Sequence, residues 1–227
     1  MFRKRLTAGD WLMIAVNLIP IWGVWFHQWN AREVFLIYCL ETILIGLVNI
    51  LRMSITSFYR KEDVWNSTGS QQTMASSWLF ICFFAVHYGF FVAIQLFIFW
   101  GTSGAETALG ISALQFVFHF PKYLSTDSLY WLGTMLISYL MIVLKEFILS
   151  GKYKTASLSL LMFEPYERII IQQFTVIVGS LFLGLGAGKI FITIFAGMKI
   201  FVEVIMDFPR MLRLTAAKES LKRIRQQ

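Results

Sequence analysis

Charged residues are scarce in this chain, and that scarcity limits the class of protein it can be. Asp, Glu, Lys and Arg make up 15% of the 227 residues, and apolar residues make up 57%. A typical soluble domain has about 25% charged residues. So few polar side chains cannot cover the surface of a water-soluble fold of this length. The composition therefore argues against a soluble globular protein.

Cysteine and sequence motifs for catalysis are also in short supply. Cys39 and Cys82 are the two cysteines, and they lack the spacing of a metal-binding or redox pair, so no disulfide framework is expected. The sequence contains no phosphate-binding glycine loop, zinc-protease helix motif or nucleophile elbow. No catalytic residue and no metal site is predicted, enzymatic activity is not favoured, and the identity of any cofactor stays unknown.

The apolar residues that are present form long blocks of membrane-spanning length. A bilayer core of about 30 Å takes about 20 helical residues. The fold class predicted is therefore all-α, a polytopic membrane helix bundle of six transmembrane helices within residues 1–208. The six spans predicted are residues 11–29, 33–53, 78–100, 130–149, 168–187 and 189–206.

The last two predicted spans have almost no loop between them. Gly184, Gly186 and Gly188 lie at their junction and favour a tight helical hairpin. One long broken helix is the alternative, but at 1.5 Å per residue it would far exceed the membrane thickness.

The distribution of Lys and Arg predicts the orientation. With the N-terminus inside, most basic residues fall in cytoplasmic segments, as the positive-inside rule requires. The outside connections would carry only Arg32, Lys122 and Lys189. We therefore expect a multi-pass protein of the cell (inner) membrane with both termini in the cytoplasm. Because most of the net charge of +7 sets topology in this way, nucleic-acid binding is not expected.

Three segments outside the spans have their own character. The polar stretch 54–77 resembles a flexible linker, and the apolar stretch 101–129 is suited to lie at the membrane interface as a lid. Residues 209–227 form a basic amphipathic pattern that predicts contact with anionic lipid headgroups or a partner, with a solvated tail as the alternative. The basic residues of this tail that would touch the membrane surface are Arg213, Lys218, Lys222, Arg223 and Arg225.

Polar residues at membrane depth are the candidate functional residues, because burying an ionisable group in lipid is costly. Glu41 lies near mid-membrane on the second predicted span, and His87 and Lys199 reach similar depth on the third and sixth. The four-residue spacing of Lys199 and Glu203 predicts that they pair along one helix. The candidate intramembrane polar site consists of Glu41, His87, Lys199, Glu203, Asn49, Gln172 and Gln173. A polar cavity or proton-accessible site is one interpretation of this set, and a hydrogen-bond network that only fixes the fold is the other.

Several stretches of the sequence resemble one family of membrane proteins. These are "CLETILIGLVNILRM" from Cys39, "VHYGFF" from Val86, "FILSGKYKTASLSLLMFEPYERIII" from Phe147 and "MKIFVEVIMD" from Met198. They are similar to the uncharacterised prokaryotic integral membrane proteins grouped as domain of unknown function 6498. The resemblance implies histidines at the positions of Gln95 and Gln173, where this chain has amides, and it implies no activity.

Three classes of function remain open at this stage. A non-catalytic subunit or scaffold of a membrane complex is favoured by the missing catalytic motifs and by small-residue helix contacts. A small proton-coupled transporter would use Glu41, His87 and Lys199. An intramembrane enzyme acting on a lipid or isoprenoid would use Glu41 or His87 as a general base. The partners expected are the lipid bilayer and either a membrane-protein partner or further copies of the chain.

Overall fold

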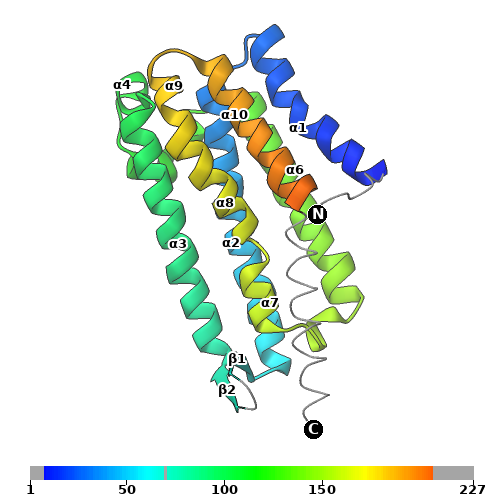
Figure 1. The fold of residues 1–227 in the computed structure, drawn as a ribbon. Coiled ribbons are helices and arrows are strands. Elements are labelled where there is room, and N and C mark those ends of the chain that lie inside the picture. Colours follow the sequence, from blue (N-terminus) through cyan, green and yellow to red (C-terminus); the bar gives the residue numbers. More distant parts are fainter. Residues whose placement is uncertain (1–7, 69–70, 207–227) are drawn as a thin grey trace. The chain divides into compact units, whose positions relative to one another are not determined.

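The computed structural model describes residues 8–68 and 71–206, and these residues are mostly helical (Figure 1). Apolar runs unbroken by glycine or proline clusters account for the long helices. The first half contains α1 (Ala8–Phe26), α2 (Ala31–Tyr59), strands β1 (Glu62–Thr68) and β2 (Gln71–Ser76), α3 (Ser77–Thr102), α4 (Ala105–Leu109), α5 (Ala113–His119) and the 3-10 turn η1 (Phe120–Lys122). The second half contains α6 (Thr126–Ile142), η2 (Val143–Leu149), η3 (Lys152–Lys154), α7 (Leu158–Phe163), α8 (Tyr166–Phe174), η4 (Thr175–Gly179), α9 (Ser180–Gly184), α10 (Gly188–Ile200) and η5 (Phe201–Met206), of which η2, η4 and η5 are π-helical.

Within the described residues, 4 helical runs are long and apolar enough to cross a membrane. They are Ala31–Tyr59, Ser77–Thr102, Thr126–Leu149 and Leu158–Gly184. The fourth run begins at Leu158, well before the predicted start of the fifth span at Arg168. The first and sixth predicted spans are helical as α1 and as α10 followed by η5.

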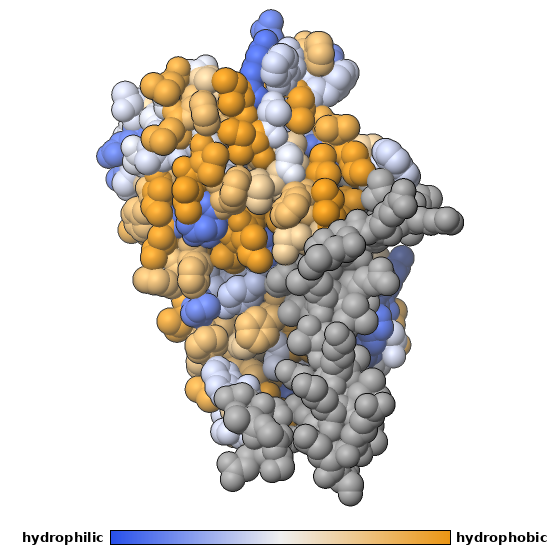
Figure 2. Space-filling view, in the orientation of Figure 1, coloured by the Kyte–Doolittle hydropathy of each residue, from blue (hydrophilic) through white to orange (hydrophobic). Residues whose placement is uncertain are grey.

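Large apolar side chains are exposed on the helices and at the turn after α9, which is compatible with insertion into a membrane. Phe26, Val86, Leu149 and Leu185 are each more than two-thirds exposed. Apolar residues make up most of the coloured part of the face in Figure 2. Contact of such side chains with lipid chains carries no hydrophobic cost, whereas their contact with water does.

The chain divides into two compact units, and the long helices contribute to both. Unit 1 comprises the described residues within 8–42, 91–133 and 167–206. Its core is aromatic: the ring of Phe35 lies 4.6 Å from that of Phe99, 5.3 Å from Phe191 and 5.5 Å from Phe195, centroid to centroid. Tilted and edge-on contacts of this kind are the favoured geometries for aromatic pairs. They join α2, α3 and α10 in unit 1.

A tight turn connects α9 and α10, as the three glycines predict. Gly186 adopts a φ of +77°, which a side chain would disfavour. A Cβ on Gly184 would lie 2.5 Å from the backbone oxygen of Thr102, so only glycine allows α9 to approach the end of α3 so closely. The glycines thus have distinct structural roles, one in the turn and one in helix packing.

Residues 101–129 form short helices rather than a regular span. Ser112 and Gln115 make a reciprocal capping box that starts α5. Phe116 is buried and its ring lies 5.1 Å from that of Trp100, which holds α5 against the end of α3. Pro121 follows α5 within η1 and cannot continue the helix, because it has no backbone N–H to donate.

Unit 2 comprises the described residues within 43–90 and 134–166, and the described residues of the predicted flexible linker form regular elements there. The prediction for residues 54–77 was wrong: α2 continues to Tyr59, and β1 and β2 form an antiparallel hairpin with an irregularity between Val64 and Asn66. Asp63 anchors the hairpin, because its Oδ2 accepts hydrogen bonds from Ser157 Oγ at 2.9 Å and from the backbone N of Leu158 at 2.6 Å. The predicted basic tail, residues 209–227, lies outside the described residues.

Candidate functional site

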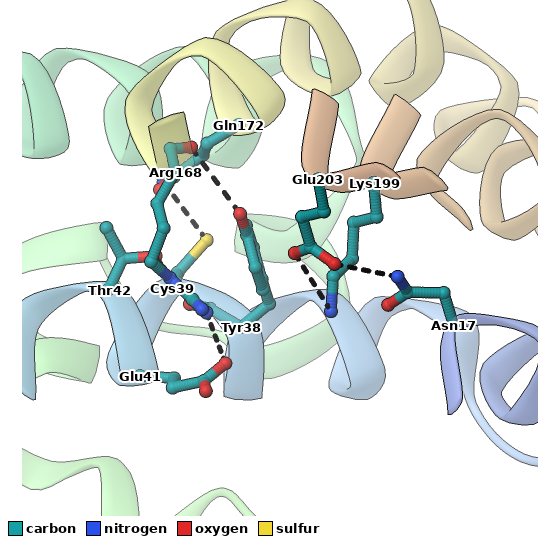
Figure 3. A network of polar contacts seen from close by, with 9 residues as sticks. All are labelled: Asn17, Tyr38, Cys39, Glu41, Thr42, Arg168, Gln172, Lys199 and Glu203. Atoms are coloured by element: carbon teal, nitrogen blue, oxygen red, sulfur yellow. Dashed lines mark hydrogen bonds and ion pairs between the residues drawn. The ribbon is translucent and has the colours of Figure 1, made fainter. Parts of the chain in front are cut away.

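A network of charged and polar side chains occupies the interior of unit 1 (Figure 3). One turn of α2 contributes Tyr38, Cys39, Glu41 and Thr42. Helix α8 contributes Arg168 and Gln172, which are four residues apart and so project from one side of that helix. Asn17 of α1, Lys199 of α10 and Glu203 of η5 complete the network.

The ion pair between Glu41 and Arg168 is the most buried charged contact of the network. Arg168 Nη2 donates directly to Glu41 Oε2, and each side chain is 11% exposed. Arg168 Nε also donates to Thr42 Oγ1 at 3.5 Å, and Thr42 Oγ1 in turn donates to the backbone oxygen of Tyr38 at 2.8 Å. Glu41 thus lies beside a guanidinium, which removes much of the cost of placing a carboxylate at this depth.

Tyr38 lies between the two cations of the network. The Arg168 guanidinium carbon is 4.3 Å from the centroid of the Tyr38 ring, and Lys199 Nζ is 5.3 Å from it. Figure 3 shows the two side chains on opposite sides of the ring. An aromatic face attracts a cation, most strongly where water is excluded. Tyr38 therefore links the two ion pairs into one network.

Lys199 and Glu203 form the second ion pair, as their spacing predicts. Lys199 Nζ lies 3.9 Å from Glu203 Oε1, which is a looser contact than that of Arg168 with Glu41. Glu203 Oε2 accepts a hydrogen bond from Asn17 Nδ2 at 2.7 Å. The carboxylate therefore ties α1 to the α10–η5 helix, and both of its oxygens face a polar group.

The amides of α8 face different helices. Gln172 Nε2 lies 3.3 Å from Cys39 Sγ on α2, whereas Gln173 Oε1 accepts from Gln95 Nε2 of α3 at 3.0 Å. Gln95 Nε2 also donates to the backbone oxygen of Ile169 at 3.1 Å. Gln95 and Gln173, the positions at which the family resemblance implies histidines, are thus in direct contact.

The other two predicted site residues, His87 and Asn49, belong to unit 2. His87 Nδ1 lies 2.5 Å from Tyr166 Oη, and its ring stacks on Phe83 with centroids 4.9 Å apart. Asn49 Nδ2 donates to the backbone oxygen of Leu161 at 2.8 Å, joining α2 to α7. The His87–Tyr166 contact joins α3 to α8, just as the Asn49 contact joins α2 to α7.

Two arginines with structural contacts were not among the predicted site residues. Arg168 was predicted as the first residue of the fifth span, at its cytoplasmic end, but the helical run begins ten residues earlier, at Leu158. Arg52 in unit 2 pairs with Glu164, Nη1 to Oε2 at 2.6 Å, and stacks over Phe147. The sequence feature that indicates a buried cation is the carboxylate of Glu41 in the middle of an apolar helix, because a buried carboxylate needs a partner of opposite charge.

The charge balance of the unit 1 network defines its chemistry. Two cations, Arg168 and Lys199, face two carboxylates, Glu41 and Glu203, so the network as a whole is neutral. Over the residues described by the structure, no group of 3 or more His, Cys, Asp or Glu side chains could hold a metal ion. The network can therefore hold helices together without leaving a net charge in the interior of unit 1.

The helices and the network define a class: an α-helical protein with apolar helices of membrane-spanning length and a neutral polar interior. The chain belongs to the DUF6498 family, a family of unknown function, whose model matches residues 1–223. Comparison with curated proteins and with solved structures found no match.

Proposed function

We propose that the protein is a six-span integral membrane protein with both termini in the cytoplasm, serving as a non-catalytic subunit or scaffold of a membrane complex. The 4 apolar runs supply four of the spans, and α1 and the α10–η5 helix would supply the first and last. The excess of Lys and Arg in the connections assigned to the cytoplasm supports this orientation.

The observation that carries the scaffold proposal is the pairing of charges within unit 1. Each cation of the network has a carboxylate partner in the same network, Arg168 with Glu41 and Lys199 with Glu203. The contacts join four separate helical segments, α1, α2, α8 and α10–η5. A neutral network of this kind suits a fixed arrangement of helices better than a site that must recruit a charged substrate.

Mass spectrometry of the protein extracted in native-like lipid particles tests the scaffold role. A protein partner at fixed stoichiometry, retained by the natural protein, is the expected result. Particles that contain only one copy of this chain and a tightly held small molecule would contradict it.

Proton-coupled transport is the second candidate, and the Lys199–Glu203 contact favours it. At 3.9 Å the two charges are more loosely paired than Arg168 and Glu41, and a carrier needs a charge pair that can separate during its cycle. Proton flux measured in vesicles that contain the purified protein tests this candidate. Lys199→Met should abolish such a flux, whereas Lys189→Met, at the exposed start of α10, should leave it unchanged. No flux above empty vesicles would exclude proton-coupled transport.

A further inference from the structure

Some buried polar atoms of unit 1 have no hydrogen-bond partner, and one of them belongs to Gln172 of the charged network. Within the described part of the chain these atoms are Arg32 Nε, Ser103 Oγ, Gln95 Oε1 and Gln172 Oε1. All four belong to unit 1. Three buried polar side chains of unit 2 differ in this respect, because Asn49, Thr56 and Asp63 have hydrogen-bond partners.

Gln95, Gln172 and Ser103 are the least accessible of the four residues. Both amides are 0% exposed, although each presents a carbonyl oxygen that needs a donor. An unsatisfied carbonyl at such depth is costly, more so than a missing hydrogen bond at the surface. Buried polar groups in folded proteins are almost always paired, with protein or with an ordered water.

Gln95 contacts the same turn of α8 that carries Gln172. Gln95 Nε2 donates to Ile169 O and to Gln173 Oε1, which flank Gln172 in one turn of α8. A donor beside this turn on the α3 side can therefore serve the Gln95 oxygen, and a donor on the side where Gln172 meets Cys39 can serve the Gln172 oxygen. Turning the Gln172 amide over would pair its oxygen with Cys39 and leave its nitrogen without a partner, so one atom needs a ligand in either orientation.

The surrounding charge selects the kind of donor. Arg168 is one turn from Gln172 on the same face of α8, and its positive charge disfavours a metal cation at the carbonyls. Water is neutral, donates two hydrogens and can also accept from an amide nitrogen. We propose that one or more water molecules occupy the turn 169–173 of α8, bound by Gln95 and Gln172 and adjacent to the Glu41–Arg168 pair.

Water at this position would allow protons to reach the ion pair, and a scaffold role does not require this property. Arg32 Nε and Ser103 Oγ are two further buried polar atoms of unit 1 that water could bind, and they belong to residues already joined by the hydrogen bond from Arg32 Nη2 to Ser103 O at 3.0 Å. The proposal does not depend on the scaffold assignment. A hydrated interior is compatible with a scaffold and is necessary for proton-coupled transport.

Cys39 offers a built-in probe, because its sulfur contacts Gln172 and is 1% exposed. In a Cys82→Ser protein Cys39 is the one remaining thiol. The infrared S–H band of this protein in lipid, followed after transfer to deuterated water, should move to the S–D position while the backbone amides of the helices remain protonated. An S–H band that persists, or that moves only in step with the helix amides, overturns the proposal.

A site variant extends the same measurement. Gln172→Leu in the Cys82→Ser background removes the acceptor and should abolish the fast phase of S–H exchange. If that variant does not fold, Gln95→Leu tests the neighbouring acceptor, and the Cys82→Ser measurement remains decisive by itself. Unchanged fast exchange in a folded Gln172→Leu protein would show that the water is not bound there.

Discussion

Arg168 and Glu41 are 127 positions apart in the sequence and form a directly hydrogen-bonded ion pair in the interior of unit 1. Neither charge could remain at this depth alone, since an unpaired charge in the low-dielectric interior would be expelled or neutralised. The pair therefore couples the position of α8 to that of α2. Any variant that removes one charge must also disturb the helix that carries the other.

Single substitutions of this pair should be strongly destabilising. Arg168→Met or Glu41→Leu leaves the partner charge uncompensated, which should lower the free energy of unfolding by about 3–5 kcal/mol. The double variant should lose clearly less than the sum of the two, because both charges are gone. Thermal unfolding of the protein in lipid particles measures all three.

Glu106→Gln is the matched control, since Glu106 is exposed on the short helix α4. It should unfold at the temperature of the natural protein. Additive losses for Glu41 and Arg168 would mean that the two charges act independently.

Of the two residues of this ion pair, the sequence predicted only Glu41 as a buried site residue. Its place on a polar stripe of a long apolar helix gave both its depth and its need for a partner. Arg168 follows Pro165 and two charged residues, a pattern typical of a loop, so its burial became evident only when the helical run was found to begin at Leu158. Depth along a helix also grouped His87 with Glu41 and Lys199, but depth does not give the direction in which a side chain points, and the Tyr166 contact of His87 was not predictable from it.

Glycine packing in unit 1 gives a second prediction. In Gly184→Ala the new Cβ would meet the Thr102 backbone oxygen at 2.5 Å, and a backbone atom cannot move aside as a side chain does. The α9 helix must shift away from α3, so we expect a loss of about 1–3 kcal/mol in the free energy of unfolding.

Gly197→Ala is the comparison for Gly184, because a Cβ at Gly197 would meet nothing within 4 Å. Alanine within α10 should be neutral or stabilise by about 0.5–1 kcal/mol, since glycine is the poorer helix former. Thermal unfolding of the two variants in parallel would refute the packing argument if Gly184→Ala proved as stable as Gly197→Ala.

The hairpin of unit 2 shows where sequence pattern is insufficient. Its polar residues lack the apolar alternation that normally identifies strands, so residues 54–77 resembled a linker. What orders the hairpin is Asp63, through contacts with Ser157 and Leu158 that are 94 and 95 positions away. The local sequence pattern does not reveal such long-range contacts of a single carboxylate.

Asp63→Ala should therefore loosen the hairpin without unfolding the helices. It removes the acceptor for Ser157 Oγ and Leu158 N together with the Arg60 ion pair at 3.5 Å, a loss of about 1–3 kcal/mol. Limited proteolysis of the variant should cleave within β1 and β2 faster than in the natural protein. Glu62→Gln changes an exposed neighbouring carboxylate and should leave the cleavage rate unchanged.

The proposed topology predicts opposite accessibility for the two ends of α3. In the Cys82→Ser background, in which Cys39 stays buried, Thr73→Cys on β2 should react with an impermeant maleimide only after the cells are permeabilised. Glu106→Cys on α4, beyond the other end of α3, should react in intact cells. The positive-inside rule supplies the reason, because the connection before α3 contains Arg60 and Lys61 whereas α4 contains no basic residue. Labelling of Thr73→Cys in intact cells, with Glu106→Cys protected, would reverse the orientation, and labelling of both from one side would rule out α3 as a membrane span.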